Sequence, residues 1–184
     1  DDRAIVIDGT GMQPDFVWIK SRNDTDNHRL VDSVRGATKH MESDGSGAEQ
    51  TSSNVKTFTS TGVTLSTNGS VNANSELYAS WAWKAGTSFT NDASGTGIGS
   101  IDSTGSVNTD AGFSIVSYTG TGSNGTLKHG LSTTPSTIIY KRRNSTSGWV
   151  VWHKSLGTGI LELNETGASQ GGSSYTNGTA PTSS

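Results

Sequence analysis

The chain has 184 residues, of which 29% are hydrophobic and 16% charged, with a formal net charge of −3 and no cysteine. This charge offers no basic surface to a polyanion, so we expect no nucleic-acid partner. No apolar run approaches the ~18 residues that span a bilayer, so no membrane insertion is expected. Without cysteine there are no disulfides or thiolate metal sites.

Short β-branched and aromatic runs between Gly, Ser, Thr and Asn clusters predict an all-β protein. In the first half, strands are expected at 17–22 and 28–33 around the polar turn NDTDN, with weaker ones at 56–59 and 62–66. The strongest is expected at 76–84, and residues 42–54 are expected to form a loop. Within 76–84, Leu77, Ala79, Trp81 and Trp83 share a face that should interdigitate with a second sheet.

Residues 87–110 are rich in Gly and Ser, which predicts a linker with at most one short strand. A strand at 112–118 follows, and then a hairpin of strands 138–143 and 149–154. No helix is expected, because apolar residues never recur with a 3.6-residue period. The predicted organisation is therefore a first β-sandwich unit over 1–86, a linker, and a second unit over 111–184.

The chain repeats itself at an offset of 121 residues. Identical pairs at this offset are Pro14/Pro135, Lys20/Lys141, Arg22/Arg143, Asn23/Asn144, Thr25/Thr146 and Gly36/Gly157. Such duplication predicts two related units and is commoner in surface and fibre proteins than in enzymes. A catalytic site would also have to explain why its residues differ between the copies.

Basic residues close the first strand of each hairpin. They are Lys20, Arg22, Lys141, Arg142 and Arg143. Such side chains can pair with carboxylates of a neighbouring strand or block unwanted edge pairing. Their recurrence favours a repeated structural contact, so we predict that they are assembly contacts between subunits.

The stretches PDFVWIKSRNDTDNHRLVDSVRGATK, ELYASWAWKAG and GFSIVSYTGTG resemble large virion or tail-associated proteins of marine and cyanobacterial bacteriophages. The resemblance implies repeated antiparallel β-sandwiches of the concanavalin-A-like or jelly-roll-like kind. It also implies a structural protein of the virion or particle surface: a tail fibre, tail-associated or capsid-decorating protein. Expected partners are copies of itself, other virion proteins and a host-surface glycan.

Members of that family usually continue past Ser184 with further strands. The second unit of this chain therefore looks truncated relative to the pattern. Strand addition between neighbouring copies is one hypothesis for how it is completed.

Three groups of residues could support metal binding or catalysis. His28, Asp32 and His40 could bind a divalent metal, but a polar strand face is the favoured interpretation, and no metal site is expected. Serines near His129 or His153 could form a nucleophile pair, yet no positioned acid–base pair is evident. The carboxylates that a polysaccharide depolymerase would need are Glu42, Glu49, Glu76, Glu162 and Glu165. None is convincingly paired, so no enzymatic activity is expected.

A lectin-like module is the main alternative function. The aromatic rings that could stack on sugars are Tyr140, Trp149, Trp152 and Tyr175, and the side chains that could bond hydroxyls are Asn144 and Asn164. The same loops could hold Ca²⁺, although nothing in the sequence supports a cofactor. The competing interpretation places these aromatic rings in the sandwich core.

Overall fold

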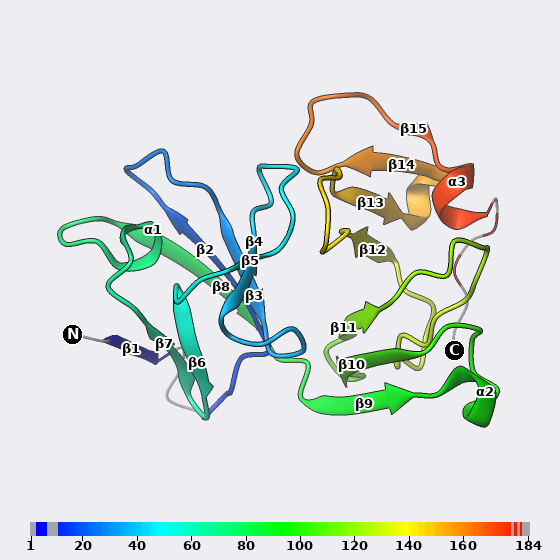
Figure 1. Cartoon of the computed structure of the whole chain (residues 1–184), viewed down its shortest axis with the longest axis horizontal. Coiled ribbons are helices and arrows are strands. Elements are labelled where there is room, and N and C mark those ends of the chain that lie inside the picture. Colours follow the sequence, from blue (N-terminus) through cyan, green and yellow to red (C-terminus); the bar gives the residue numbers. More distant parts are fainter. Residues whose placement is uncertain (1–2, 7–10, 178, 180, 182–184) are drawn as a thin grey trace.

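The structure is a computed structural model that describes residues 3–6, 11–177, 179 and 181. The described chain is all-β, with its strands in four antiparallel sheets. Two sheets belong to an N-terminal half that ends near residue 86, and two to a C-terminal half that begins at residue 87. The halves lie side by side (Figure 1).

The N-terminal half is a β-sandwich. Its larger sheet has the order β5 (Gln50–Thr51), β4 (Lys39–Met41), β3 (Arg29–Asp32), β2 (Phe16–Ser21) and β8 (Tyr78–Trp83). Its smaller sheet has the order β1 (Arg3–Val6), β7 (Gly62–Leu65) and β6 (Val55–Thr59). A short helix, α1 (Gly69–Asn72), precedes β8.

Alternation along the strands builds the core of this sandwich. Val17 and Ile19 of β2 point inward and are at most 2% exposed, and they meet Val63 and Leu65 of β7. Burying each such side chain contributes about 1.5–3 kcal/mol to the stability of the fold. Phe16 and every second residue after it in β2 point to the opposite, outer face of the larger sheet.

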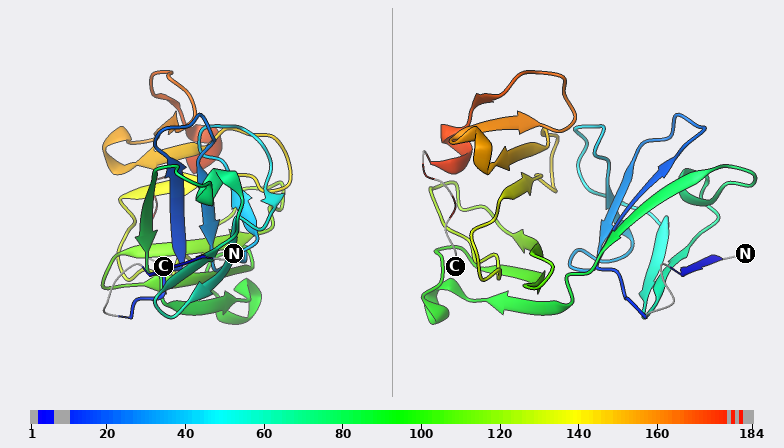
Figure 2. Two further views of the ribbon diagram at one scale, coloured as in Figure 1. Left: turned by 90° about the vertical axis from the view of Figure 1, so that its left-hand side faces the viewer. Right: turned by 180° about the vertical axis from the view of Figure 1, so that it is seen from behind.

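The C-terminal half has a three-stranded and a four-stranded sheet. The first has the order β11 (Phe113–Tyr118), β10 (Ser103–Asn108) and β9 (Thr87–Asn91). The second has the order β12 (Thr137–Tyr140), β13 (Val150–His153), β14 (Gly159–Glu162) and β15 (Gln170–Gly171). Figure 2 shows both from behind. The short helices are α2 (Ala93–Thr96), the 3-10 turn η1 (Lys154–Leu156) and α3 (Ser173–Thr176).

The segment 87–110 is not a linker, which corrects the sequence-based expectation. It forms β9, α2 and β10, and β10 lies at the centre of its sheet. A Cβ on Gly105 would lie 2.5 Å from both the Phe89 ring and the Ile115 carbonyl oxygen. Glycine is therefore needed there for close strand approach. In the sequence, the same glycine is typical of a flexible linker.

Two further expectations are wrong. Short helices do occur, but α1 and α2 are single turns capped by Asn68 and Asp92, too short to show a 3.6-residue period. The face of β8 that carries Trp81 and Trp83 does not enter the sandwich core. Instead Tyr78 and Ala82 pack against the core, and Trp81 and Trp83 are 48% and 38% exposed.

The predicted strands occur with ends within three residues of those expected, and the repeat extends to strand pairing. In the first hairpin Val17 pairs with Val31, and in the second Ile138 pairs with Trp152 at an offset of 121. The other three pairs of each hairpin correspond at the same offset. The surroundings differ, since β2 has β8 as its second neighbour and β12 lies at a sheet edge. The division into two related units stays a prediction.

Candidate functional site

The two halves meet where the turn of the second hairpin lies against the loop that follows β4. Glu49 N donates to the Arg143 carbonyl at 2.8 Å, and Ser147 N donates to the Ser46 carbonyl at 2.9 Å. The ammonium group of Lys141 reaches the same Ser46 carbonyl at 3.2 Å. This contact is called the junction below, and it covers residues 42–49 and 141–149.

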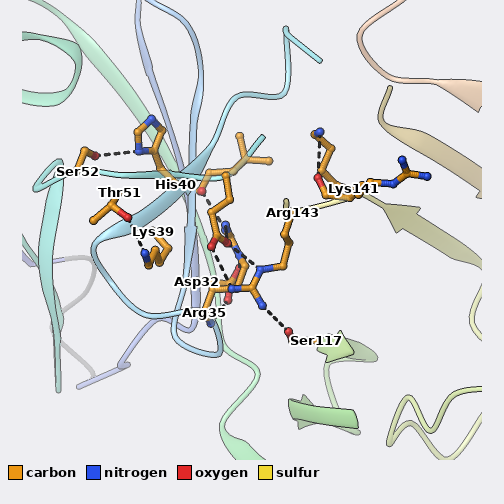
Figure 3. A network of polar contacts seen from close by, with 12 residues as sticks. Asp32, Arg35, Lys39, His40, Thr51, Ser52, Ser117, Lys141 and Arg143 are labelled. Atoms are coloured by element: carbon orange, nitrogen blue, oxygen red, sulfur yellow. Dashed lines mark hydrogen bonds and ion pairs between the residues drawn. The ribbon is translucent and has the colours of Figure 1, made fainter. Parts of the chain in front are cut away.

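Charged side chains reinforce the junction (Figure 3). Arg143 donates to Glu49 from Nε at 2.9 Å and from Nη2 at 3.0 Å, and to the Ser117 hydroxyl at 2.7 Å. Arg35 donates to Glu49 at 3.1 Å and also pairs with Asp32. The side chains of Arg35 and Asp32 are only 5% exposed. The four charges alternate in sign, so each buried charge has an opposite neighbour, which offsets its loss of water.

The network sets the protonation of its members. Burial opposes ionisation of Glu49, but the hydrogen bonds from Arg143 and Arg35 outweigh it and hold the pKa of Glu49 below its usual value. The hydrogen bond with Glu49 in turn raises the pKa of Arg143. A carboxylate held ionised by two guanidinium groups is a structural ion pair and is poorly suited to donate a proton.

Trp149 is the apolar centre of the junction. Its side chain packs against Leu30 and Met41 on the outer face of the N-terminal sheet, and the residue is only 4% exposed. Its indole N–H donates to the carbonyls of Glu42 at 2.8 Å and Gly45 at 3.1 Å. The junction therefore combines a buried ring, a satisfied donor and an ion-pair network.

Beside the junction lies an aromatic face, formed by Phe16 and Trp18 of β2 and Trp81 and Trp83 of β8. Phe16 is paired with Trp83 and Trp18 with Trp81 across the strands, with ring centroids 5.3 and 6.1 Å apart. Phe113 of the C-terminal half stacks on Trp83 at 6.1 Å. At the other end of this face Trp18 packs against the Trp149 cluster, and Trp81 remains 48% exposed.

The five tryptophans differ in how their indole N–H groups are satisfied. Trp18 donates to His28 Nδ1, Trp149 to the junction carbonyls, and Trp152 to the Gly157 carbonyl at 2.7 Å. No described residue accepts a hydrogen bond from Trp81 or Trp83. Trp81 thus combines an exposed ring with a free donor, whereas the ring of Trp83 is already stacked on Phe113.

His28, Asp32 and His40 are not brought together as metal ligands would be. His28 and Asp32 share the outer face, whereas His40 pairs with Val31 across the strands and so points to the inner one. Asp32 is bound by Arg35, and the His40 Nδ1 lies 2.8 Å from the Ser52 hydroxyl (Figure 3). Burial lowers the pKa of His40, and the charge of Arg29 adds to this effect. Among the described residues no metal-binding cluster is found.

Of the other catalytic candidates, Glu42, Glu49 and His153 have structural partners, whereas the buried Oε2 of Glu76 accepts no hydrogen bond from the described residues. Glu42 pairs with Arg29 and Glu49 with two arginines. His153 lies 2.6 Å from the Ser155 hydroxyl and accepts from the Ser155 backbone N–H as the cap of η1. No carboxylates of the described chain face each other as paired acid and base, so no structural observation favours a depolymerase.

A surface pocket of about 710 Å³ in the C-terminal half is lined by Asp92, Asp102, Tyr118 and Arg143, among others. Its carboxylates serve the backbone: Asp102 accepts from Ala93 N at 2.8 Å and Asp92 caps α2. Hydrogen bonds from Ser94 and Gly95 lower the pKa of Asp92. These groups are explained by the local fold.

The predicted glycan-binding residues are dispersed. Trp149 and Trp152 are 4% and 2% exposed and offer no free ring face. Burial raises the pKa of Tyr140, in keeping with a largely covered ring. Asn164 accepts from Trp149 N at 2.8 Å. Only Tyr175, 51% exposed on α3, and Asn144 lie open to solvent, and the interpretation stays a prediction for them.

The residues predicted to be assembly contacts also differ in their surroundings. Lys141 and Arg143 bind the N-terminal half of the same chain. Lys20 donates to carbonyls of its own turn, and Arg142 reaches only Ser145 at 3.4 Å. Arg22 is exposed and no described residue pairs with its side chain. A role between subunits stays a prediction.

Sequence reasoning missed the open rings of Trp81 and Trp83, and the one available signal was their i, i+2 spacing in a strand. It also missed Glu49 as the partner of Arg143, because 94 residues separate them.

No helix in the described part of the chain has the length and apolar character needed to cross a membrane. No curated protein and no solved structure matches the chain. The model of one family, a domain of unknown function (DUF7483), matches residues 1–184, and the chain therefore belongs to that family.

Proposed function

We propose that this chain is a structural module of a bacteriophage particle, in a tail fibre, a tail-associated protein or a capsid decoration. It works by assembly with other copies of itself or with other virion proteins, and without catalysis. The phage setting is supported by the sequence resemblance described above.

The observation that carries the proposal is the distribution of charged and apolar side chains. Glu49, Arg35 and Arg143 join the two halves of the chain, while large apolar side chains remain exposed on sheet faces. Among the strand residues, the most exposed of these are Ile139 at 51% and Trp81 at 48%. A β protein that leaves apolar sheet surface in contact with water is suited to bind further subunits.

Light scattering on the full chain during size-exclusion chromatography, over a concentration series, tests this function. We expect a mass that rises with concentration in discrete steps, and electron microscopy should show ordered particles. A monomer at every concentration, or only amorphous aggregate, would contradict assembly.

Carbohydrate binding is a second candidate, favoured by the exposed rings and free indole donors of Trp81 and Trp83. Replacing both by alanine should abolish retention on a glycan array or in a polysaccharide affinity gel, because stacking rings dominate such contacts. Tyr118→Ala, which removes a ring 42% exposed on β11, is the matched control. Equal retention of all three proteins, or no retention of the wild type, would exclude this face as a glycan site.

A further inference from the structure

The outer face of the first hairpin is covered in this structure, but that of the second is not. Leu30 pairs with Met41 across the strands, and the corresponding pair of the C-terminal half is Val151 with Leu161. Trp149 covers Leu30 and Met41, which are 4% and 8% exposed. In contrast, Leu161 is 38% exposed.

The uncovered surface extends over three strands. Ile139 of β12 is 51% exposed, Val151 lies between it and Leu161, and Leu163 just beyond β14 is 41% exposed. These side chains share one face by alternation. We call them the open face: Ile139, Val151, Leu161 and Leu163.

The turn of the first hairpin lacks a contact that the second one makes. Arg143 binds Glu49 of the loop after β4, whereas Arg22, at the same place in the repeat, has no partner among the described residues. The loop after β14, residues 163–169, takes the place of the loop after β4 and is mostly exposed. Its one carboxylate, Glu165, is exposed and is bonded only to neighbouring Asn164 at 3.1 Å.

We propose that the junction is repeated between molecules: the turn 20–28 of one copy docks on the open face and on loop 163–169 of a second copy. Arg22 pairs with Glu165 there, as Arg143 pairs with Glu49 within the chain. This inference rests on the proposed assembly function and specifies its interface. The contact is heterologous, because turn and face are different surfaces, so it generates rings or filaments. It is weaker than the junction, since His28 stands where the second hairpin has Trp149.

Complementation between variants of the full chain tests the proposal. Arg22→Glu disables the turn, and Leu161→Lys with Leu163→Lys disables the open face. Each variant should associate at least about tenfold more weakly than the wild type, because one lost ion pair or buried contact of 1.4 kcal/mol corresponds to a factor of ten. An equimolar mixture should form 1:1 dimers and nothing larger, since only one competent interface remains. A charge exchange, Arg22→Glu with Glu165→Arg, should restore assembly.

Thr57→Lys, a charge placed on an exposed side chain of β6 in the smaller N-terminal sheet, is the control and should assemble like the wild type. Circular dichroism and thermal unfolding identify any variant that fails to fold, and the charge exchange provides the test in that case. Undiminished assembly of the folded turn and face variants would overturn this interface while the assembly function stands. A wild type that never assembles would overturn both.

Discussion

Arg143 donates two hydrogen bonds to Glu49, from Nε to Oε2 at 2.9 Å and from Nη2 to Oε1 at 3.0 Å. The two residues are 94 positions apart and belong to different halves of the chain. Only the planar guanidinium group can bind both carboxylate oxygens in this parallel manner. The orientation of the C-terminal half against the N-terminal half is therefore fixed by geometry as well as by charge.

Arg143→Ala should lower the free energy of unfolding by about 1–2 kcal/mol, because it leaves the buried Glu49 with one partner fewer. The lower end of the range is expected, since the Arg143 side chain is itself 40% exposed. Chemical denaturation measures this loss, and a double-mutant cycle with Glu49→Gln isolates the pair. Arg142→Ala, on the exposed neighbour, should stay within about 0.5 kcal/mol of the wild type. Equal effects of the two alanine variants would contradict a special role for Arg143.

Stability should fall in two stages as the pH is lowered. His40 has a lowered pKa in the folded chain, so its contribution is complete above its ordinary value of about 6.5 and is lost as the pH falls toward the folded value. Glu49 also has a lowered pKa, so its contribution is complete above about 4.3 and is lost below that. Urea denaturation from pH 8 to pH 3 measures both stages.

His40→Gln is expected to remove the first stage and leave the second. The matched control is His153→Gln on the second hairpin, which should keep both. A first stage that survives His40→Gln would show that another group titrates there.

Much of the fold could be predicted because local patterns encode it. The hairpins around NDTDN and NSTSG have β-branched and aromatic runs beside turn residues, and their strands form where expected. The strands β9 and β10 could not be predicted, since their Ser, Thr and Gly residues resemble a linker. The close approach that requires Gly105 is made by Phe89 and Ile115, which lie 16 and 10 residues away.

The candidate site was much less predictable. Alternation assigns Trp81 and Trp83 to one face but does not say which face is buried, and the structure places them outside. The basic residues of the repeat indicated a structural contact, yet identical residues behave differently: Arg143 is bonded and Arg22 is not. This difference depends on the position of Glu49 in three dimensions, which sequence spacing does not contain.

Trp149→Ala should destabilise the chain by about 3–5 kcal/mol, because it leaves a cavity beside Leu30 and Met41. It also leaves the Glu42 and Gly45 carbonyls without their indole donor. Trp149→Phe should cost less, since it retains most of the ring contact. Denaturant unfolding measures both losses. Trp81→Ala, on the aromatic face, should lower the free energy of unfolding much less than either. A smaller loss for Trp149→Ala than for Trp81→Ala would contradict the junction described above.

Gly105→Ala should be destabilising by about 1–3 kcal/mol, although it places a methyl group in a segment rich in Gly and Ser. The new Cβ would lie 2.5 Å from the Phe89 ring and from the Ile115 carbonyl, so the central strand of the sheet must move. Phe89→Leu should recover part of the loss by removing the ring, whereas the backbone contact with Ile115 remains. Gly47→Ala is the control, because no atom lies within 4 Å of a Cβ there, and its effect should stay within about 0.5 kcal/mol. Thermal unfolding measures all four proteins, and a neutral Gly105→Ala would show that β9 and β11 do not approach β10 this closely.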